Sequence, residues 1–260
     1  MLANLRARLL AVWRLLRVVG WVVWGMAVVH TRFGGWTAQR RRFEVQQWSQ
    51  RMLCAMGVQL RVVGDAPPCG PLLVVANHVS WLDILVLNAA RPARFVSKSD
   101  VKRWPLLGGL VAGAGTLFIE RESRRDAMRV VHHMAEALLA GDVVAVFPEG
   151  TTGNGQSLLP FHANLLQPAV STGVPVQPVG VAYRNPATGD LSDAPVYVGN
   201  TTLAASIWRT LTAPDGVVAW VVHGELLTEP GPDRRVLAQT VHDLIHNRLL
   251  VQTRAGAFFS

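Results

Sequence analysis

Apolar and polar positions alternate along the chain in blocks that predict a layered α/β domain. Short runs rich in Val and Leu, of the length of buried strands, are separated by longer segments whose apolar residues recur at helical spacing. The strand-like runs are Gln59–Val63, Leu72–Ala76, Arg94–Ser97, Thr116–Ile119, Val143–Phe147, Val176–Tyr183 and Val218–His223. The helical segments are Ser80–Ala90, Glu122–Ala140, Phe161–Thr172, Leu203–Leu211 and Asp233–Val251. This order predicts a mixed sheet flanked by helices.

The N-terminal sequence predicts a helix that precedes this domain. The segment Leu2–His30 is rich in Leu, Val and Trp, and its Arg6, Arg14 and Arg17 fall within an arc of about 80°. The charge-free stretch Val18–Val29 has 12 residues, well below the roughly 20 that a membrane-spanning helix needs. We therefore expect the helix to lie in a membrane interface and not to span the bilayer.

A glycine-containing turn and the basic run Arg40–Arg42 lead into a second helix that ends near Met56. Its apolar residues form one stripe, made of Val45, Trp48, Met52 and Met56. The two helices can dock on anionic lipid headgroups, or the stripe can pack on the chain's own core. The sequence thus predicts a membrane-associated two-helix segment (residues 1–57), a domain (58–252) and a short tail (253–260).

Composition supports one large core and an anionic partner. The chain has 260 residues, half of them apolar, and a formal net charge of +8. Several arginines lie beside Trp-rich apolar sequence, which favours a membrane partner over nucleic acid. Two cysteines far apart in the sequence indicate a reducing compartment and neither a zinc site nor a redox pair. The pairs His132–His133 and His242/His246 lack a third ligand nearby in sequence, so we expect no metal site.

The segment Asn77–Asp83 lies where a strand-like run gives way to a helical one, so its polar side chains can face a cleft. His78 is a candidate general base, because imidazole titrates near neutral pH and can accept a proton from an alcohol. Asp83 can accept the other ring N–H and fix the tautomer. The alternative is structural, because Ser80 and Asp83 have the spacing of a capping box that closes a helix N-terminus.

Three further stretches lie at strand-like runs, where α/β proteins gather their sites. Gly115–Arg121 places Arg121 just after the strand-like run Thr116–Ile119, where it can be a cation of the site or an ion-paired surface group. Phe147–Gly155 carries three glycines and two threonines, which can cradle a phosphate or polar headgroup, or can form a plain turn. Val174–Val179 contains two prolines, which predict an edge strand or a site-facing end of the sheet.

The motifs N-H-x-S-x-x-D, G-x-x-F-I-x-R, F-P-E-G-T and V-P-V-x-P-V follow one another in this order. With them the chain resembles the 1-acylglycerol-3-phosphate acyltransferase family of glycerolipid acyltransferases. The resemblance covers about Val58–Glu225, and the N-terminal helical pair is similar to that of bacterial members. It implies that His78 is the base and that Asp83 orients it. It also implies an acceptor headgroup site made of Arg121, Glu149, Gly150, Thr151 and Lys98.

The resemblance further implies transfer of a fatty acyl group from acyl-CoA or acyl carrier protein to the sn-2 hydroxyl of 1-acylglycerol-3-phosphate. The product would be phosphatidic acid for phospholipid synthesis, made at the cytoplasmic face of the inner membrane. The sequence has no G-x-S-x-G nucleophile elbow, and both cysteines lie outside the motifs. We therefore expect direct transfer without an acyl-enzyme, and no cofactor besides the acyl donor.

Departures from the family pattern leave other acceptors and other classes open. Thr152 and Gly153 follow F-P-E-G-T where many members have Arg and Ser, and His162 stands where lysine is common. Because two cations are absent, a lyso-ornithine lipid is the alternative to lysophosphatidate. A thioesterase would use the same donor with water, and a non-catalytic peripheral membrane protein would need only the helical pair. The small-residue run Gly108–Gly115 can let an acyl chain pass close to the backbone, or it can serve packing.

Overall fold

The computed structural model describes residues 2–65, 67, 70–98, 107–113, 115–119 and 124–255. Its strands are β1 (Val58–Val63), β2 (Leu72–Ala76), β3 (Arg94–Lys98), β4 (Leu117–Ile119), β5 (Val143–Val146), β6 (Val176–Arg184) and β7 (Val217–His223). Its helices are α1 (Leu2–Thr31), α2 (Ala38–Met56), α3 (Asp83–Ala90), α4 (Leu107–Gly113), α5 (Arg124–Leu139), α6 (Gln167–Thr172), α7 (Leu203–Thr212) and α8 (Arg234–Ala255). Short 3-10 turns lie at Phe33–Gly35 and Ala163–Leu166. Every predicted strand is present, and α4 is a helix that the periodicity did not predict.

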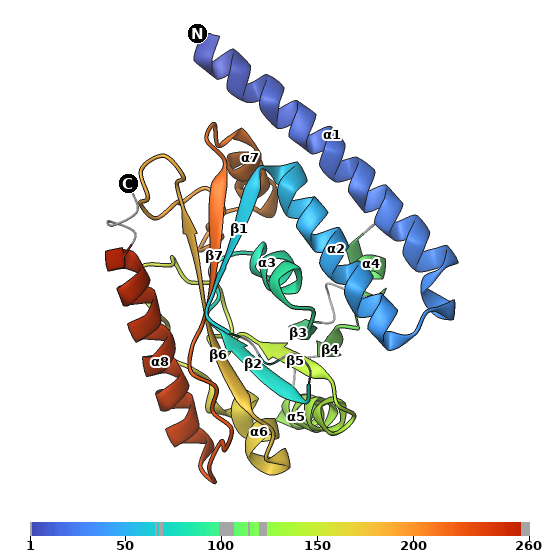
Figure 1. Cartoon of the computed structure of the whole chain (residues 1–260), viewed down its shortest axis with the longest axis vertical. Coiled ribbons are helices and arrows are strands. Elements are labelled where there is room, and N and C mark those ends of the chain that lie inside the picture. Colours follow the sequence, from blue (N-terminus) through green and yellow to red (C-terminus); the bar gives the residue numbers. More distant parts are fainter. Residues whose placement is uncertain are drawn as a thin grey trace.

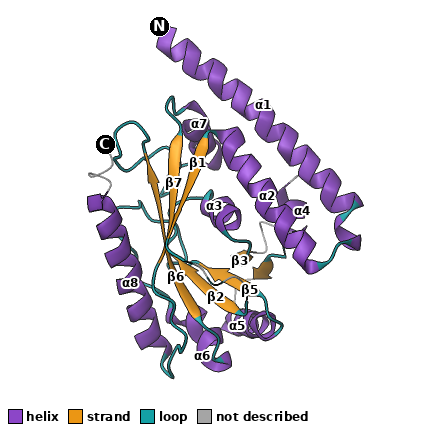
Figure 2. Cartoon of the chain, in the orientation of Figure 1, coloured by secondary structure: helices purple, strands orange, loops and turns teal. Residues whose placement is uncertain are grey.

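The strands form one sheet in the order β1-β7-β6-β2-β5-β3-β4 (Figure 2). Neighbouring strands are parallel except β6 and β7, which run antiparallel, so the predicted mixed sheet is confirmed. β2 lies in the middle of the sheet and is buried along its whole length. Its alternate residues Leu73 and Val75 face one core, whereas Leu72, Val74 and Ala76 face the other. This is why β2 is apolar at every position.

Helices cover both faces of the sheet, which gives three layers (Figure 1). α2 and α3 pack on one face, where Leu53 and Leu82 are buried against the strands. α5, α6 and α8 pack on the other face, where Met134 and Ile245 are buried. The carboxyl end of β2 therefore leads directly into the segment that carries His78, between the sheet and α3.

The prolines of Val174–Val179 do not mark an edge strand, so the first of the two predicted alternatives is wrong. β6 lies between β2 and β7, and Val176 and Val179 are fully buried. Pro178 is tolerated because antiparallel pairing with β7 begins only at the next residue, where Val179 pairs with His223. The missing N–H of Pro178 thus falls just before that ladder starts.

The apolar stripe of α2 packs on the chain's own core, as the second of the two alternatives predicted. Met52 and Met56 are buried, and Nε1 of Trp48 donates to the carbonyl oxygen of Trp21 in α1 at 2.9 Å. The outward apolar surface of the two-helix segment lies instead on α1. Its exposed residues recur every three or four positions, and they include Leu5, Leu9, Val12, Leu16, Val19 and Val23.

Arg14 ties α1 to the end of α7. Its Nη1 donates to the carbonyl oxygens of Leu211 at 2.9 Å and Ala213 at 2.8 Å, and the residue is 7% exposed. The last carbonyls of a helix lack intrahelical donors and carry partial negative charge, which a guanidinium satisfies. Arg14 is therefore buried in a protein contact. The arc of about 80° that it shares with Arg6 and Arg17 in the helix does not make these three residues one exposed surface.

Gly25 allows α1 to approach α2 and α4 closely. A Cβ atom at this position would lie 2.7 Å from Nε1 of Trp48 and 3.0 Å from Cδ2 of Leu110. We expect Gly25→Ala to lower the midpoint of thermal unfolding by roughly 2–10 °C, because overpacking costs about 1–3 kcal/mol. The matched control is Gly20→Ala in the same helix, where a Cβ atom meets nothing within 4 Å. That variant should unfold at or above the native midpoint, and equal losses in both variants would contradict the close packing.

Residues 108–113 of the small-residue run lie in α4, which packs against α1. A Cβ atom at Gly113 would lie 3.0 Å from Cγ1 of Val29. At this position the structure favours helix packing over passage of an acyl chain.

Candidate active site

His78 and Asp83 meet at the turn between β2 and α3. Nδ1 of His78 lies 2.8 Å from Oδ2 of Asp83. The side chain of His78 is 20% exposed and that of Asp83 is 0% exposed, so the pair has one buried and one accessible end. Within the described part of the chain, Nε2 of His78 has no hydrogen-bond partner. This arrangement can accept a proton at Nε2 from an alcohol that enters the accessible side.

Four donors converge on the carboxylate of Asp83. Besides the ring of His78, Oδ2 accepts the backbone N–H groups of Val79 at 2.7 Å and Ser80 at 2.9 Å. Oδ1 accepts the hydroxyl of Tyr183 at 2.6 Å. Donors on both oxygens stabilise a charged carboxylate and fix its plane.

Of the predicted capping box, the structure shows one of the two bonds between Ser80 and Asp83, and the N-cap of α3 is Leu82, which makes no side-chain cap. α3 begins at Asp83, whose carboxylate receives the N–H group of Ser80 as in a capping box. Oγ of Ser80 in turn accepts the N–H group of Leu82 at 3.2 Å. One carboxylate therefore holds the two backbone N–H groups that precede α3 and the imidazole of His78.

Tyr183 is a site residue that the sequence analysis did not identify. It lies 100 residues from Asp83 in the chain, near the end of β6, and is 2% exposed. No local motif marks it. The available signal was strand register: if V-P-V-x-P-V pairs with Leu72–Ala76, the continuation of that strand must pass beside the turn after β2.

Two contacts fix the position of the His78 turn. Asn77 pairs with the backbone of Val181 in β6: its Nδ2 donates to the carbonyl at 2.9 Å, and its Oδ1 accepts the N–H group at 2.7 Å. The ring of His78 stacks on Phe147, with ring centroids 4.1 Å apart and an interplanar angle of 12°. The end of β2 and the plane of the imidazole are both constrained as a result.

Glu149 joins the His78 turn to the loop that follows β5. The residue is 5% exposed; Oε1 accepts the N–H group of His78 at 2.8 Å, and Oε2 accepts that of Leu159 at 3.0 Å. Burial raises the pKa of Glu149, and the two N–H donors oppose this shift by favouring the ionised form. Both carboxylate oxygens contact backbone donors, so Glu149 supports the loop from inside.

The loop after Glu149 reaches the His78 turn through its backbone. The N–H group of Gly153 donates to the carbonyl oxygen of His78 at 2.7 Å. Gly150 has a φ of 70°, and a Cβ atom there would lie 3.0 Å from Cδ2 of His162. Thr151 is exposed, whereas the hydroxyl of Thr152 donates to a backbone carbonyl of the loop after β6. His162 is thus the titratable side chain that the structure places beside Gly150.

Two predicted headgroup residues are not placed by the structure. Arg121 lies outside the described residues, and only the backbone of Lys98, at the end of β3, is described. That backbone pairs with Ile119 at the end of β4. The strands that lead toward the two cations therefore end side by side, and the role of the cations stays a prediction.

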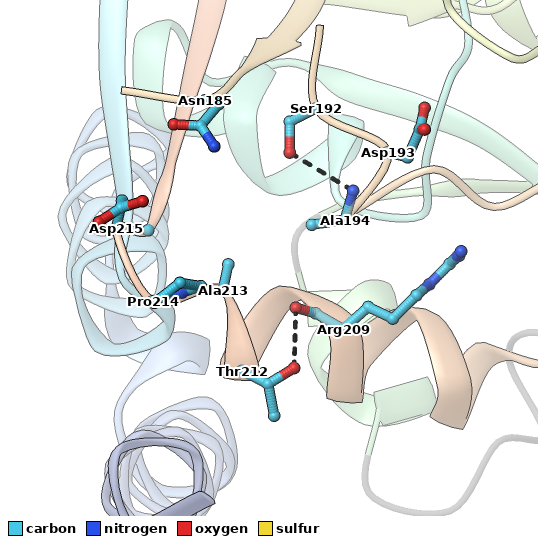
Figure 3. Close-up of a pocket in the computed structure, with 10 residues that line it drawn as sticks. Asn185, Ser192, Asp193, Ala194, Arg209, Thr212, Ala213, Pro214 and Asp215 are labelled. Atoms are coloured by element: carbon cyan, nitrogen blue, oxygen red, sulfur yellow. Dashed lines mark hydrogen bonds between the residues drawn. The ribbon is translucent and has the colours of Figure 1, made fainter. Parts of the chain in front are cut away.

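A cavity of about 370 Å³ lies elsewhere, between the end of α7 and the start of β7 (Figure 3). Asp193, Arg209 and Asp215 are among its lining residues, and none of the predicted site residues is. Its polar groups bond to one another, as where the hydroxyl of Thr212 donates to the carbonyl of Arg209 at 3.2 Å. Geometry and chemistry therefore assign the candidate site to the His78 turn and not to this cavity.

We expect Glu149→Gln to destabilise the protein and slow its reaction. The side chain of glutamine has one acceptor oxygen and one amide NH2 group. The N–H group of either His78 or Leu159 would therefore face a donor in place of a carboxylate oxygen. An unsatisfied buried group costs about 1–3 kcal/mol, which urea unfolding can measure. Glu229→Gln at an exposed loop position is the control and should unfold like the native protein. Equal stability of Glu149→Gln would contradict the two backbone bonds.

The chain matches known acyltransferases over most of its length. Residues 59–182 match the family model described as Acyltransferase. The lyso-ornithine lipid O-acyltransferase of Pseudomonas aeruginosa is 37% identical over 271 residues, covering 96% of this chain and 100% of that protein. The 1-acyl-sn-glycerol-3-phosphate acyltransferase of Neisseria meningitidis is 39% identical over 181 residues, 69% of either chain.

The fold is similar to a solved structure of the same class. The crystal structure of the 1-acyl-sn-glycerophosphate acyltransferase PlsC from Thermotoga maritima superposes with a TM-score of 0.71, covering 96% of this chain and 97% of that one. At 20% sequence identity this likeness concerns the fold, and it confirms the predicted layered α/β architecture. The family itself is shown by the relative that matches over its full length, and the match of the family model to residues 59–182 agrees with it. The chain belongs to the acyltransferase family and is an O-acyltransferase of the glycerolipid type.

Proposed function

We propose that this enzyme transfers a fatty acyl group from a thioester donor to the free hydroxyl of a lysolipid, with His78 as the general base. The observation that carries the proposal is the contact between Nδ1 of His78 and the buried carboxylate of Asp83. It holds the imidazole in the tautomer whose Nε2 can accept a proton.

In the proposed reaction, Nε2 of His78 takes the proton of the acceptor hydroxyl as the oxygen attacks the thioester carbonyl carbon. Asp83 stabilises the imidazolium that forms. The carbon–sulfur bond then breaks, the new ester remains, and the leaving thiolate receives the proton from His78. Cys54 lies on α2 beside Arg17, and the sequence has no G-x-S-x-G elbow and no cysteine in its motifs, so the transfer that we propose is direct.

The acceptor that we propose is a lyso-ornithine lipid. Two observations support it: the relative that matches over its full length carries that name, and the loop after Glu149 has no fixed cation at Thr152 or Gly153. A phosphate headgroup is best held by arginine or lysine donors. An ornithine headgroup carries an ammonium and a carboxylate, so its net charge is zero and it requires fewer cationic side chains than a phosphate does.

Lysophosphatidate, the acceptor preferred on sequence, is the second candidate. The Neisseria meningitidis relative carries that activity in its name. Arg121 and Lys98 follow the ends of two adjacent strands and are predicted to supply the cations that a phosphate needs. In this case the product would be phosphatidic acid, made from acyl-CoA or acyl carrier protein.

One assay separates these candidates. Purified enzyme is given each acceptor with each donor, and release of the free thiol and formation of the acylated lipid are measured. We expect thiol release that depends on the acceptor and is faster with lyso-ornithine lipid. Faster turnover of lysophosphatidate would select the second candidate, and thiol release without any acceptor would indicate a thioesterase.

We further propose that α1 lies in the interface at the cytoplasmic face of the inner membrane. One helix among the described residues, Leu5–Thr31, is long and apolar enough to cross a membrane. However, Arg14 in its middle is bonded to the end of α7, and a spanning helix would draw that polar contact into hydrocarbon. The exposed apolar face of α1 fits an orientation parallel to the surface.

Binding to anionic vesicles tests this orientation. The double substitution Leu9→Glu and Leu16→Glu places two charges on the exposed face of α1, and we expect it to abolish sedimentation with the vesicles. The control is Met128→Glu with Leu139→Glu, which adds the same charges at equally exposed apolar positions of α5. Equal binding of the two variants would reject the α1 interface.

A further inference from the structure

The hydroxyl of Tyr183 binds Oδ1 of Asp83, the carboxylate oxygen to which the His78 turn donates no hydrogen bond. Oδ2 of Asp83 is shared by His78, Val79 and Ser80, all of which belong to the same turn. Among the described residues, the partner of Oδ1 is the hydroxyl of Tyr183, which reaches it from β6 at 2.6 Å. The orientation and the charge of the carboxylate are therefore set from two sides, one local and one from the central sheet.

The position of the hydroxyl is fixed by the sheet. Tyr183 pairs with Ala219 of β7, and its carbonyl oxygen accepts the N–H group of Ser192 at 2.9 Å. Two residues earlier, Val181 is locked to Asn77 by paired hydrogen bonds of 2.9 Å and 2.7 Å. A donor held this firmly is preorganised, and a hydrogen bond to a buried charge is stronger than one in water.

Among the residues that the structure describes, Glu149 is a further charged group near the pair. Glu149 approaches from the loop after β5 and binds the backbone of His78, and its charge interacts with His78 and Asp83. Tyr183 approaches from β6 and has its pKa raised well above the usual value by burial, with the charge of Asp83 acting in the same direction. The tyrosine hydroxyl therefore keeps its proton over the pH range of an assay, and toward the carboxylate of Asp83 it acts as a donor.

We propose that Tyr183 is a positioning residue that acts on the base through Asp83. By binding Oδ1 it fixes the plane of the carboxylate and draws part of its negative charge away from Oδ2. The charge that His78 senses, and hence its basicity, is then tuned by a residue outside the motifs. This inference rests on the proposed role of His78 as the base.

The test is the pH profile of Tyr183→Phe, which removes the hydroxyl and keeps the ring. We expect kcat to fall about tenfold, as for a lost bond to a charged group, while KM for both substrates stays within about twofold. Without the hydroxyl donor, the carboxylate charge falls more strongly on His78. The acid limb of kcat/KM should consequently move to higher pH by about half a unit.

The chain has two tyrosines, so Tyr197→Phe is the matched control. The described hydrogen bonds of Tyr197 are made by its backbone, which the substitution retains. The control should keep the acid limb of the native profile. A lowered kcat in Tyr183→Phe with an unmoved acid limb would mean that Tyr183 is only structural, and this would overturn the proposal.

A second measurement avoids any loss of packing. In the Tyr197→Phe background, 3-fluorotyrosine is incorporated at position 183 alone. Its more acidic hydroxyl is a stronger donor, so the acid limb should move to lower pH, opposite to Tyr183→Phe. An unmoved limb in the fluorinated enzyme would also overturn the proposal, even if Tyr183→Phe fails to fold. An active, folded His78→Ala enzyme would instead remove the proposed function, so the two failures can be distinguished.

Discussion

Replacing His78 with alanine is expected to lower kcat by about 10²–10⁴-fold, the usual contribution of a general base, while the protein stays folded. The fold should survive because the two backbone bonds of position 78 remain when the ring and its stacking on Phe147 are removed. The N–H group of position 78 binds Glu149, and its carbonyl oxygen accepts the N–H group of Gly153. Alanine keeps both bonds and removes only the imidazole.

The measurement is acceptor-dependent thiol release by both proteins at equal concentration, together with their thermal unfolding. His133→Ala is the control, because that imidazole is 61% exposed on α5 and lies beside Glu136. It should leave the rate unchanged. If folded His78→Ala kept the native rate, the imidazole could not be the base.

Replacing Asp83 with asparagine is expected to lower kcat by about 10³-fold with little change in KM; the same change in a Ser-His-Asp triad costs about 10⁴-fold. Asparagine can still present an oxygen to the three donors of the turn, and its amino group can donate to the hydroxyl of Tyr183. The variant therefore keeps the shape of the site. It loses the negative charge that stabilises the imidazolium of His78.

Steady-state kinetics of Asp83→Asn with the preferred acceptor check this expectation. Asp243→Asn provides the control, because its side chain is 58% exposed on α8. A rise in KM with kcat preserved would mean that Asp83 serves substrate binding. A protein that does not fold would show that the structural role of Asp83 in this turn dominates its role toward His78.

Much of the fold could be predicted from sequence because it depends on local periodicity. The strand β2 is buried on both faces and is accordingly apolar at every position. The pair His78 and Asp83 could be predicted for the same reason: both lie in one turn, and the distance between them is set by a few backbone angles. Where the pattern is local, residue spacing is enough.

The contacts that escaped prediction join segments far apart in the chain. Tyr183 reaches Asp83 across 100 residues, and Arg14 reaches Leu211 across 197. The apolar stripe of α2 was compatible with a lipid surface and with a protein core. Periodicity shows which residues share a helix face, but it does not show whether lipid or protein covers that face. The sequence leaves open whether the prolines of β6 mark an edge strand or a site-facing end of the sheet, because it does not show that the pairing of β6 with β7 begins one residue after Pro178.

The central claim is that Asp83 holds the imidazole of His78 with the proton on Nδ1 and the lone pair on Nε2. The ¹⁵N signals of the histidine rings report this directly, and comparison with His78→Gln identifies those of position 78. For the neutral ring we predict a protonated Nδ1 and an unprotonated Nε2, with that preference lost in Asp83→Ala, which offers no acceptor to the ring N–H. A proton on Nε2 in the native enzyme would contradict the account, because the nitrogen that faces the acceptor could then take no proton from it.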